Sequence, residues 1–270
     1  MLLALPCLLY LASAALYVIY LFRQKASTQK MAFGLFCVAV AFHVLATIIL
    51  AFKIGNLPVH NMQQTLSLAA LAVSCAFIYA QKVFRLKILG VFASCLAAGV
   101  MVGAVAVPQA PAEQQAILNS FWLWFHIILV FLGEAALALA CGAGILYLLQ
   151  EHGIKAKRQG FFYKRLPSLD LLDSTSYTCI TVGFTLLTFG LVTGFIYAKT
   201  ALGRFWGWDQ KEIWSVGTWL FYAALLHCRL YSGWQGRKSA IMTIVGFGLL
   251  VFTFLGVNIL LGGYHQVFTR

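Results

Sequence analysis

The sequence predicts an all-α polytopic membrane protein with about eight transmembrane helices. Hydrophobic residues make up 62% of its 270 residues, charged residues only 10%, and the mean hydropathy is +0.88. A soluble domain is about half apolar and about a quarter charged, so this composition excludes a chain built chiefly of soluble domains. The apolar segments are each close to the roughly twenty residues that a spanning helix needs. They are 2–22, 31–52, 62–81, 86–107, 121–149, 177–198, 213–231 and 239–261.

The distribution of positive charge predicts the orientation of these helices. Arg23 and Lys25 follow the first segment and no basic residue precedes it, which is the reverse of a signal peptide, so we expect this helix to be retained. With the N-terminus outside, fourteen of the nineteen Lys and Arg residues lie in inner connections. The positive-inside rule therefore favours both termini on the outer side, periplasmic or extracellular. The net charge of +12 is then a topology signal, and no nucleic-acid partner is expected.

We expect two membrane regions, residues 1–120 with four helices and residues 121–270 with the remainder.

Seven cysteines are scattered singly, and the sequence contains neither CxxC nor CxxCH. This pattern indicates no zinc site, no redox pair and no covalent haem site. The cysteines are expected to act as small buried hydrophobes.

The sixth helix carries two local signals. Asp170, Asp173 or Ser174 is expected to cap its start. Further along, Gly190 and Gly194 are four residues apart. Such a pair either lets two membrane helices approach closely or is tolerated in a helix without any such contact.

The stretch 202–215, on the outer side, has the most concentrated chemistry in the chain. It contains Trp206, Trp208 and Trp214, two acids and two bases, between two apolar segments. Trp prefers the membrane–water interface, and charge beside hydrocarbon is costly. The stretch is therefore either an aromatic platform for a large flat ligand or an aromatic belt that anchors two helices.

Two histidines are expected on the same outer surface as this stretch. His126 begins the fifth helix and His265 follows the last one. Two imidazoles on opposite sides of a flat aromatic shelf can ligate both axial positions of a haem iron. Arg204 and Lys199 are candidates to pair with the haem propionates, and Lys211 is a further candidate.

The other histidines are weaker candidates. His227 lies in the inner part of the seventh helix and His43 within the second. An ionisable residue within a span is a candidate for function, although a membrane histidine can also form a plain helix–helix hydrogen bond. His60 is expected outside and His152 in an inner loop, with no role assigned to either.

Residues 205–215, FWGWDQKEIWS, resemble the WWD domain of haem-handling membrane proteins (the CcmC, CcmF and CcsA group). More narrowly, they are similar to the CcsA (ResC) type of system II cytochrome c biogenesis protein. Supporting matches are LPSLDLLD at 166–173, GFTLLT at 183–188, LHCR at 226–229, and GVN at 256–258 with Tyr264 and His265. The resemblance is strong over about 121–268 and weaker over 55–68. Proteins of the HemX type, linked to regulation of haem biosynthesis, are close to this group.

The resemblance implies an integral protein of the bacterial cytoplasmic membrane that carries haem b outward. It implies that His126 and His265 are the axial ligands of an outer haem and that His227 is a ligand of an inner one. Haem would be presented for thioether attachment to the CxxCH of an apocytochrome c, with attachment activity only in complex with a CcsB (ResB)-like membrane subunit. The outer site would also include the side chains of the Trp-rich stretch: Trp206, Trp208, Trp214, Arg204 and Asp209.

Asp209 and Glu212 are expected to orient neighbouring groups such as Arg204 or Lys211, with helix capping as the alternative for Glu212. The sequence departs from the family pattern at two positions: Leu202 replaces the first Trp of the domain, and Gln210 replaces a Pro. Two other functions compete with attachment. One is a HemX-like haem-binding regulator or chaperone without ligation activity, and the other is a transporter unrelated to haem.

Overall fold

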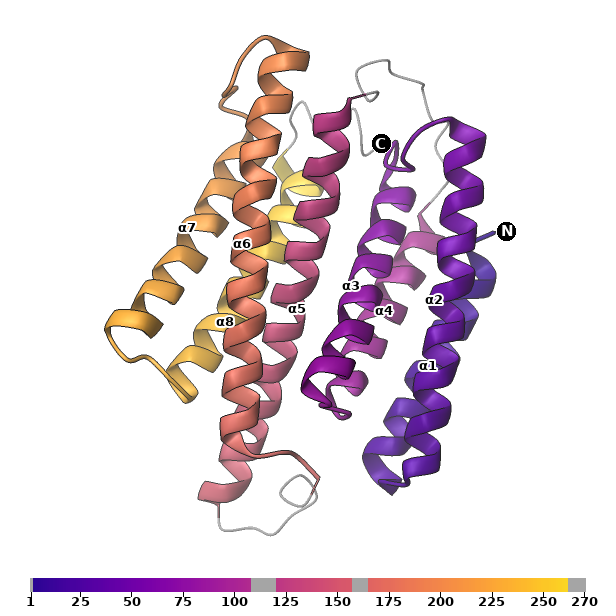
Figure 1. Ribbon diagram of the computed structural model, residues 1–270, viewed down its shortest axis with the longest axis vertical. Helices are drawn as coiled ribbons and strands as arrows, with labels where there is room; N and C mark the ends of the chain where they lie inside the picture. Colours follow the sequence, from indigo (N-terminus) through magenta and orange to yellow (C-terminus); the bar gives the residue numbers. More distant parts are fainter. Residues whose placement is uncertain (1, 108–119, 157–164, 262–270) are drawn as a thin grey trace. The chain divides into compact units, whose positions relative to one another are not determined.

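The computed structural model describes residues 2–107, 120–156 and 165–261 (Figure 1). These residues form eight α-helices and one π-helix and contain no strand, so the all-α prediction is confirmed. The chain divides into two compact units, Met1–Gln114 with Arg270, and Gln115–Thr269.

The first unit contains four helices. They are α1 (Ala4–Arg23), α2 (Ala26–Ile54), α3 (Met62–Phe84) and α4 (Leu89–Ala106). Aromatic rings fill its core edge to face: Phe36 lies 5.4 Å from Tyr10 and 5.3 Å from Phe77, measured between ring centroids. Tyr17 also contacts Phe77, and it fits because Gly90 of α4 has no side chain, since a Cβ there would lie 2.2 Å from the Tyr17 ring.

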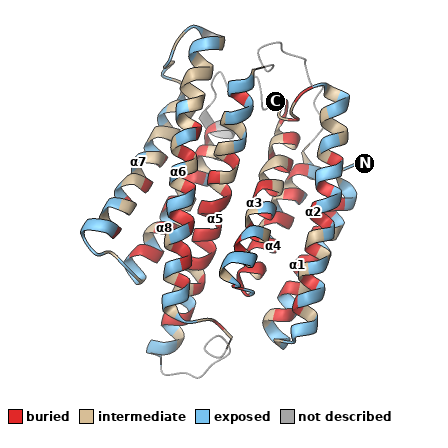
Figure 2. Ribbon diagram, in the orientation of Figure 1, coloured by how far each residue is buried: buried red, intermediate tan, exposed pale blue. Residues whose placement is uncertain are grey.

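The second unit is organised around its first helix. Its elements are α5 (Phe121–Lys155), α6 (Leu169–Leu202), α7 (Gln210–Tyr231) and α8 (Arg237–Val251), which continues as the π-helix η2 (Phe252–Leu261). Two thirds of the most apolar stretch of α5 is buried, against one third for α6, and Figure 2 shows the long buried run of α5. The unit therefore packs α6 and α8 against α5.

Seven of these eight helices are long and apolar enough to cross a membrane, with α8 counted together with η2 as far as Val257. The remaining one is α7, whose sequence holds Lys211, Glu212 and Arg229 together with several polar residues. The prediction of a multi-span membrane protein is confirmed. The expected outer location of both termini stays a prediction.

The start of the sixth helix lies before the apolar segment and before the expected cap residues. The apolar segment begins at 177, but α6 begins at Leu169, because the side chains of Asp173, Ser174 and Ser176 in its first two turns are hydrogen-bonded within the fold. The cap is Ser168, whose hydroxyl oxygen accepts from the Leu171 N–H at 3.3 Å. Asp170, Asp173 and Ser174 all lie inside the helix, so none of them is the N-cap.

Candidate functional site

Glycines bring α5 and α6 into close contact along one seam of the second unit. A Cβ on Gly183 would lie 2.7 Å from the Leu137 side chain, and a Cβ on Gly190 would lie 2.7 Å from Val130. A Cβ on Gly194 would lie 2.7 Å from Nδ1 of His126. The pair Gly190 and Gly194 therefore does what a small-xxx-small pattern can do, because it lets the backbone of α6 approach α5.

His126 lies at the end of this seam where α5 begins and where it contacts Gly194. Its Nδ1 lies 2.7 Å from the carbonyl oxygen of Gly190, and the side chain is half-buried. A carbonyl oxygen only accepts, so Nδ1 carries the proton and donates it. In the neutral ring the lone pair is then on Nε2, the arrangement that protein histidines use when Nε2 binds a metal.

The Trp-rich segment begins where α6 ends. Gly203 has a positive φ of 74° and terminates α6 as its left-handed C-cap. Trp206 then packs back onto α6, with its ring centroid 6.0 Å from Phe195 and 5.8 Å from Trp208. Because Phe195 is the next residue after Gly194, one turn of α6 carries both the His126 contact and the Trp206 contact. The structure thus places His126 and this segment at the same end of the unit.

Glu212 shapes the turn that leads into α7. Its carboxylate accepts from the N–H of Gly207 at 2.7 Å and from the N–H of Asp209 at 3.3 Å. Asp209 is the N-cap of α7, and the two acids form a reciprocal capping box. The predicted capping role of Glu212 is confirmed, and the group that it orients is the backbone on both sides of Trp208.

Trp208 has an uncommon backbone conformation. Its φ is +58°, in the left-handed region, and 77% of its surface is exposed. This conformation costs an ordinary residue about 1–2 kcal/mol, and such residues cluster at functional sites. The conformation directs a large aromatic ring outward, away from the helices of its own unit.

The predicted cations of the outer site have different surroundings. The guanidinium of Arg204 lies against Gly207, where a Cβ would be 2.8 Å from it, so a side chain at 207 would displace Arg204. The ammonium of Lys199 lies 5.3 Å above the Phe205 ring and donates to the Gly203 carbonyl at 3.4 Å. Lys199 therefore stabilises the end of α6, whereas Arg204 belongs to the Trp-rich turn itself.

A buried donor lies within this segment. Among the residues that the structure describes, the indole N–H of Trp206 has no hydrogen-bond acceptor, although the nitrogen is buried. A buried polar group without a partner costs about 1–3 kcal/mol, so an acceptor supplied by a ligand would stabilise it. A carboxylate, such as a haem propionate, is an acceptor of this kind.

The third Trp occupies a different place. Trp214 packs edge to face on Phe252, at 4.8 Å between centroids, where α7 meets η2. One turn later the hydroxyl groups of Thr218 and Thr253 are hydrogen-bonded at 2.8 Å. Trp214 therefore ties α7 to η2, the element that leads toward His265. His265 itself lies outside the described residues.

His227 lies far from this cluster, near the other end of α7. It is exposed, and its ring stacks on Tyr231 one turn later at 4.7 Å between centroids. The remaining described histidines have other surroundings. His43 is fully buried and contacts the Tyr10 hydroxyl and Ser67, His60 is buried, and His152 is exposed.

Sequence reasoning missed one acid in this unit. Glu134, within α5, interacts electrostatically with Lys211 at the start of α7. A carboxyl group within an apolar run was the signal that could have drawn attention to it.

Known proteins resemble this chain over most of its length. The model of the family described as "Cytochrome C assembly protein" matches residues 2–265. Similar proteins include three named "Cytochrome c biogenesis protein CcsA". The one from Gloeothece citriformis is 31% identical, over 87% of this chain and 87% of its own. The one from Microcystis aeruginosa is 30% identical, over 97% of this chain and 93% of its own. The one from Chlamydomonas reinhardtii is 34% identical, over 79% of this chain and 62% of its own.

Proposed function

The chain belongs to the cytochrome c assembly protein family and has a role in cytochrome c maturation, and on that premise we propose that it handles haem as a CcsA-type subunit. It takes haem b from the inner side of a bacterial cytoplasmic membrane and presents it on the outer side to an apocytochrome c. A CcsB (ResB)-like membrane subunit completes the working complex.

The observation that carries this proposal is the state of His126. The 2.7 Å hydrogen bond to Gly190 holds the proton on Nδ1, and contact with Gly194 limits the ring's position. A ring that is oriented by a second hydrogen bond is a better metal ligand than a mobile one. His126 is therefore suited to bind the substrate's iron through Nε2, with His265 as the second axial ligand.

The Trp-rich segment supplies the rest of the outer site. The rings of Trp206 and Trp208 offer apolar faces to the porphyrin, and the Trp206 N–H and the Arg204 guanidinium suit its propionates. Asp209 and Glu212 contribute by holding the turn, and Trp214 by fixing the start of α7. These groups orient the substrate and exclude water around it.

Attachment needs orientation rather than an acid–base pair. Each cysteine thiol of the apocytochrome CxxCH adds its S–H across a vinyl C=C, so that sulfur bonds to one carbon and hydrogen to the other. No external oxidant is consumed. Holding both reactants in one geometry can supply much of the rate acceleration for such an addition.

The test is the visible absorption spectrum of the purified protein beside His126→Ala and His265→Ala. We expect a reduced low-spin haem spectrum in the wild type that is lost or altered in either variant. His152→Ala is the matched control, because His152 is exposed at the opposite end of α5. A wild type that purifies colourless and takes up no added haem, with or without its partner, would contradict the outer site.

A HemX-like regulator or chaperone is the second candidate function, and the departures at Leu202 and Gln210 favour it. It predicts bound haem without attachment. Covalent haem on a CxxCH reporter cytochrome, measured in cells with and without this chain, separates the two functions. Covalent haem that does not depend on this chain would favour the regulator.

A further inference from the structure

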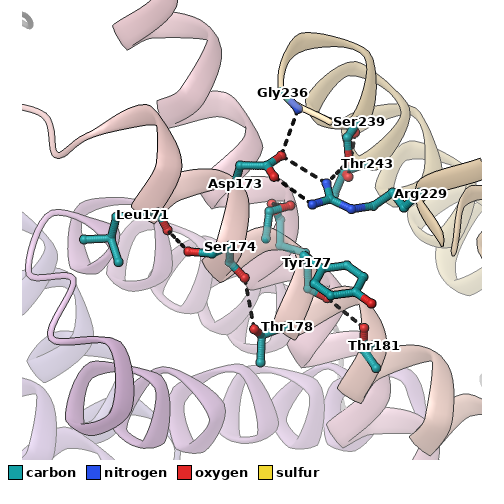
Figure 3. A network of polar contacts seen from close by, with 12 residues as sticks. Leu171, Asp173, Ser174, Tyr177, Thr178, Thr181, Arg229, Gly236, Ser239 and Thr243 are labelled. Atoms are coloured by element: carbon teal, nitrogen blue, oxygen red, sulfur yellow. Dashed lines mark hydrogen bonds and ion pairs between the residues drawn. The ribbon is translucent and has the colours of Figure 1, made fainter. Parts of the chain in front are cut away.

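The end of the second unit opposite the Trp-rich segment contains an ion pair between a buried arginine and a half-buried aspartate that the function above does not use. The two terminal nitrogens of Arg229 donate to the two carboxylate oxygens of Asp173 at 3.0 and 2.7 Å (Figure 3). Only 6% of the Arg229 side chain is exposed. The guanidinium also donates to the Ser239 hydroxyl and lies 4.8 Å above the Tyr177 ring. One side chain of α7 is thereby fixed to both α6 and α8.

The same carboxylate also holds the connection between α7 and α8. Asp173 accepts from the N–H of Gly236, the residue just before α8, at 3.0 Å. Gly236 has a φ of +64°, and a Cβ there would lie 2.6 Å from the Tyr147 hydroxyl of α5. Asp173 therefore ties the end of α7 and the start of α8 to α6, directly beside α5.

The ion pair and His227 lie on different faces of α7. Residues two apart on an α-helix differ by about 200° around the helix axis. Arg229 points into the unit, so His227 points away from it, in agreement with its exposure. The stacking of the imidazole on Tyr231 then orients the ring plane.

We propose that Asp173 and Arg229 are positioning residues for His227, because their two-pronged ion pair holds α7 in the one rotation that directs the imidazole away from the other helices of its unit. This inference rests on the proposed function, since it takes His227 as an inner haem ligand. It also assigns the inner haem to the outer surface of α7 rather than to the interior of this unit. A planar guanidinium is required, because a lysine ammonium cannot form the fork.

The test uses the purified full chain with its membrane partner and defines two haem signals. The inner signal is the part of the absorption and EPR spectrum that is lost in His227→Ala, and the outer signal is the part lost in His126→Ala. The variants are Arg229→Lys and Asp173→Asn. The matched control is Arg237→Gln, which breaks the ion pair with Glu151 at the same end of the unit but does not involve α7.

We expect both variants to shift the EPR g values and the midpoint potential of the inner haem. Haem affinity at the inner site should fall roughly tenfold, which is the lower end of the loss seen when a residue that orients a metal ligand is replaced. The outer signal and the Arg237→Gln spectra should match the wild type. Added imidazole, which needs no positioning, should restore a low-spin inner haem in Arg229→Lys.

Three results would contradict the inference, and they are distinguishable. An unchanged inner signal in both variants would show that the ion pair does not position His227. Loss of the outer signal as well, without rescue by imidazole, would show that the pair only maintains the fold. A wild type whose spectrum equals that of His227→Ala would instead contradict the inner site of the proposed function, and this inference with it.

Discussion

Nδ1 of His126 donates a 2.7 Å hydrogen bond to the backbone carbonyl of Gly190. The acceptor belongs to a helix that starts more than forty residues later in the chain, and it is within reach only because α5 and α6 pack on glycine. The Thr193 hydroxyl donates to the same carbonyl at 2.9 Å. The geometry of the predicted haem ligand therefore depends on residues that carry no reactive group.

Gly194→Ala is expected to displace His126. The new methyl carbon would lie 2.7 Å from Nδ1, so the ring or the helix must shift, which typically costs about 1–3 kcal/mol of stability. Haem titration followed by absorption should show at least roughly tenfold weaker binding to the variant. Gly248→Ala is the control, since a Cβ there meets nothing within 4 Å. Equal haem affinity in both variants would argue against this role for the α5–α6 contact.

Glu212→Ala is expected to loosen the turn before α7, whereas Glu212→Gln should retain most of it. Alanine removes the acceptor of the Gly207 and Asp209 amides, and the loss of such a cap costs about 1 kcal/mol. Glutamine keeps one acceptor oxygen. Thermal unfolding monitored by tryptophan fluorescence measures both variants, with Gln210→Ala, an exposed neighbour, as the control. Identical unfolding of the Ala and Gln variants would be inconsistent with the observed hydrogen bonds.

Trp208→Gly is expected to lower haem affinity while leaving the stability of the protein nearly unchanged. Glycine adopts a φ of +58° without the penalty of about 1–2 kcal/mol, and this gain offsets the lost contact with Trp206, worth about 0.5–1.5 kcal/mol. The free energy of unfolding should therefore change by less than about 1 kcal/mol while haem affinity falls. Denaturant titration and haem titration of one preparation measure the two quantities, beside Trp234→Ala as a control. Unchanged haem affinity in this variant would show that Trp208 does not contribute to haem binding at the outer site.

His43→Ala is expected to destabilise the first unit and leave the haem spectrum unchanged. One ring nitrogen of His43 lies 3.2 Å from the Tyr10 hydroxyl and the other 2.8 Å from the Ser67 hydroxyl, so both are used inside the unit. Removing the ring leaves these hydroxyls buried, at a cost of about 1–3 kcal/mol. The midpoint of thermal unfolding and the absorption spectrum are the readouts. Loss of a haem signal in this variant would show that His43 takes part in haem binding.

Arg229→Gln is expected to destabilise the protein far more than Arg237→Gln. Arg229 has 6% of its side chain exposed and Arg237 has 59%, although both lie at the same end of the second unit. Breaking a fully buried pair costs about 3–5 kcal/mol because a charge is left uncompensated, and this is an upper bound here because the Asp173 side chain is 20% exposed; an exposed pair contributes less than about 1 kcal/mol. Denaturant unfolding of the two variants makes the comparison. Similar losses would indicate that the burial of Arg229 adds nothing to the strength of its ion pair.

Much of the fold follows from hydropathy, because each span must be long and apolar. The prediction was wrong where polar residues form helix, as at Leu169–Ser176, since hydropathy does not register side chains that are satisfied by tertiary contacts. Asp173 shows this well. It was expected to be a possible cap, but it is the partner of Arg229, fifty-six residues away.

For the candidate site, topology and the resemblance to the family made His126 and His227 candidate ligands, and these stay predictions. The chain's local pattern was sufficient to identify the Trp-rich segment and the capping role of Glu212. These depend on residue type and on spacing within a few turns, which local sequence contains. The protonated nitrogen of His126, the direction of His227 and the interhelical role of His43 required the packed structure. Each depends on which side chains and carbonyls of distant helices meet, and close packing between helices is decided by the complementary shapes of whole surfaces.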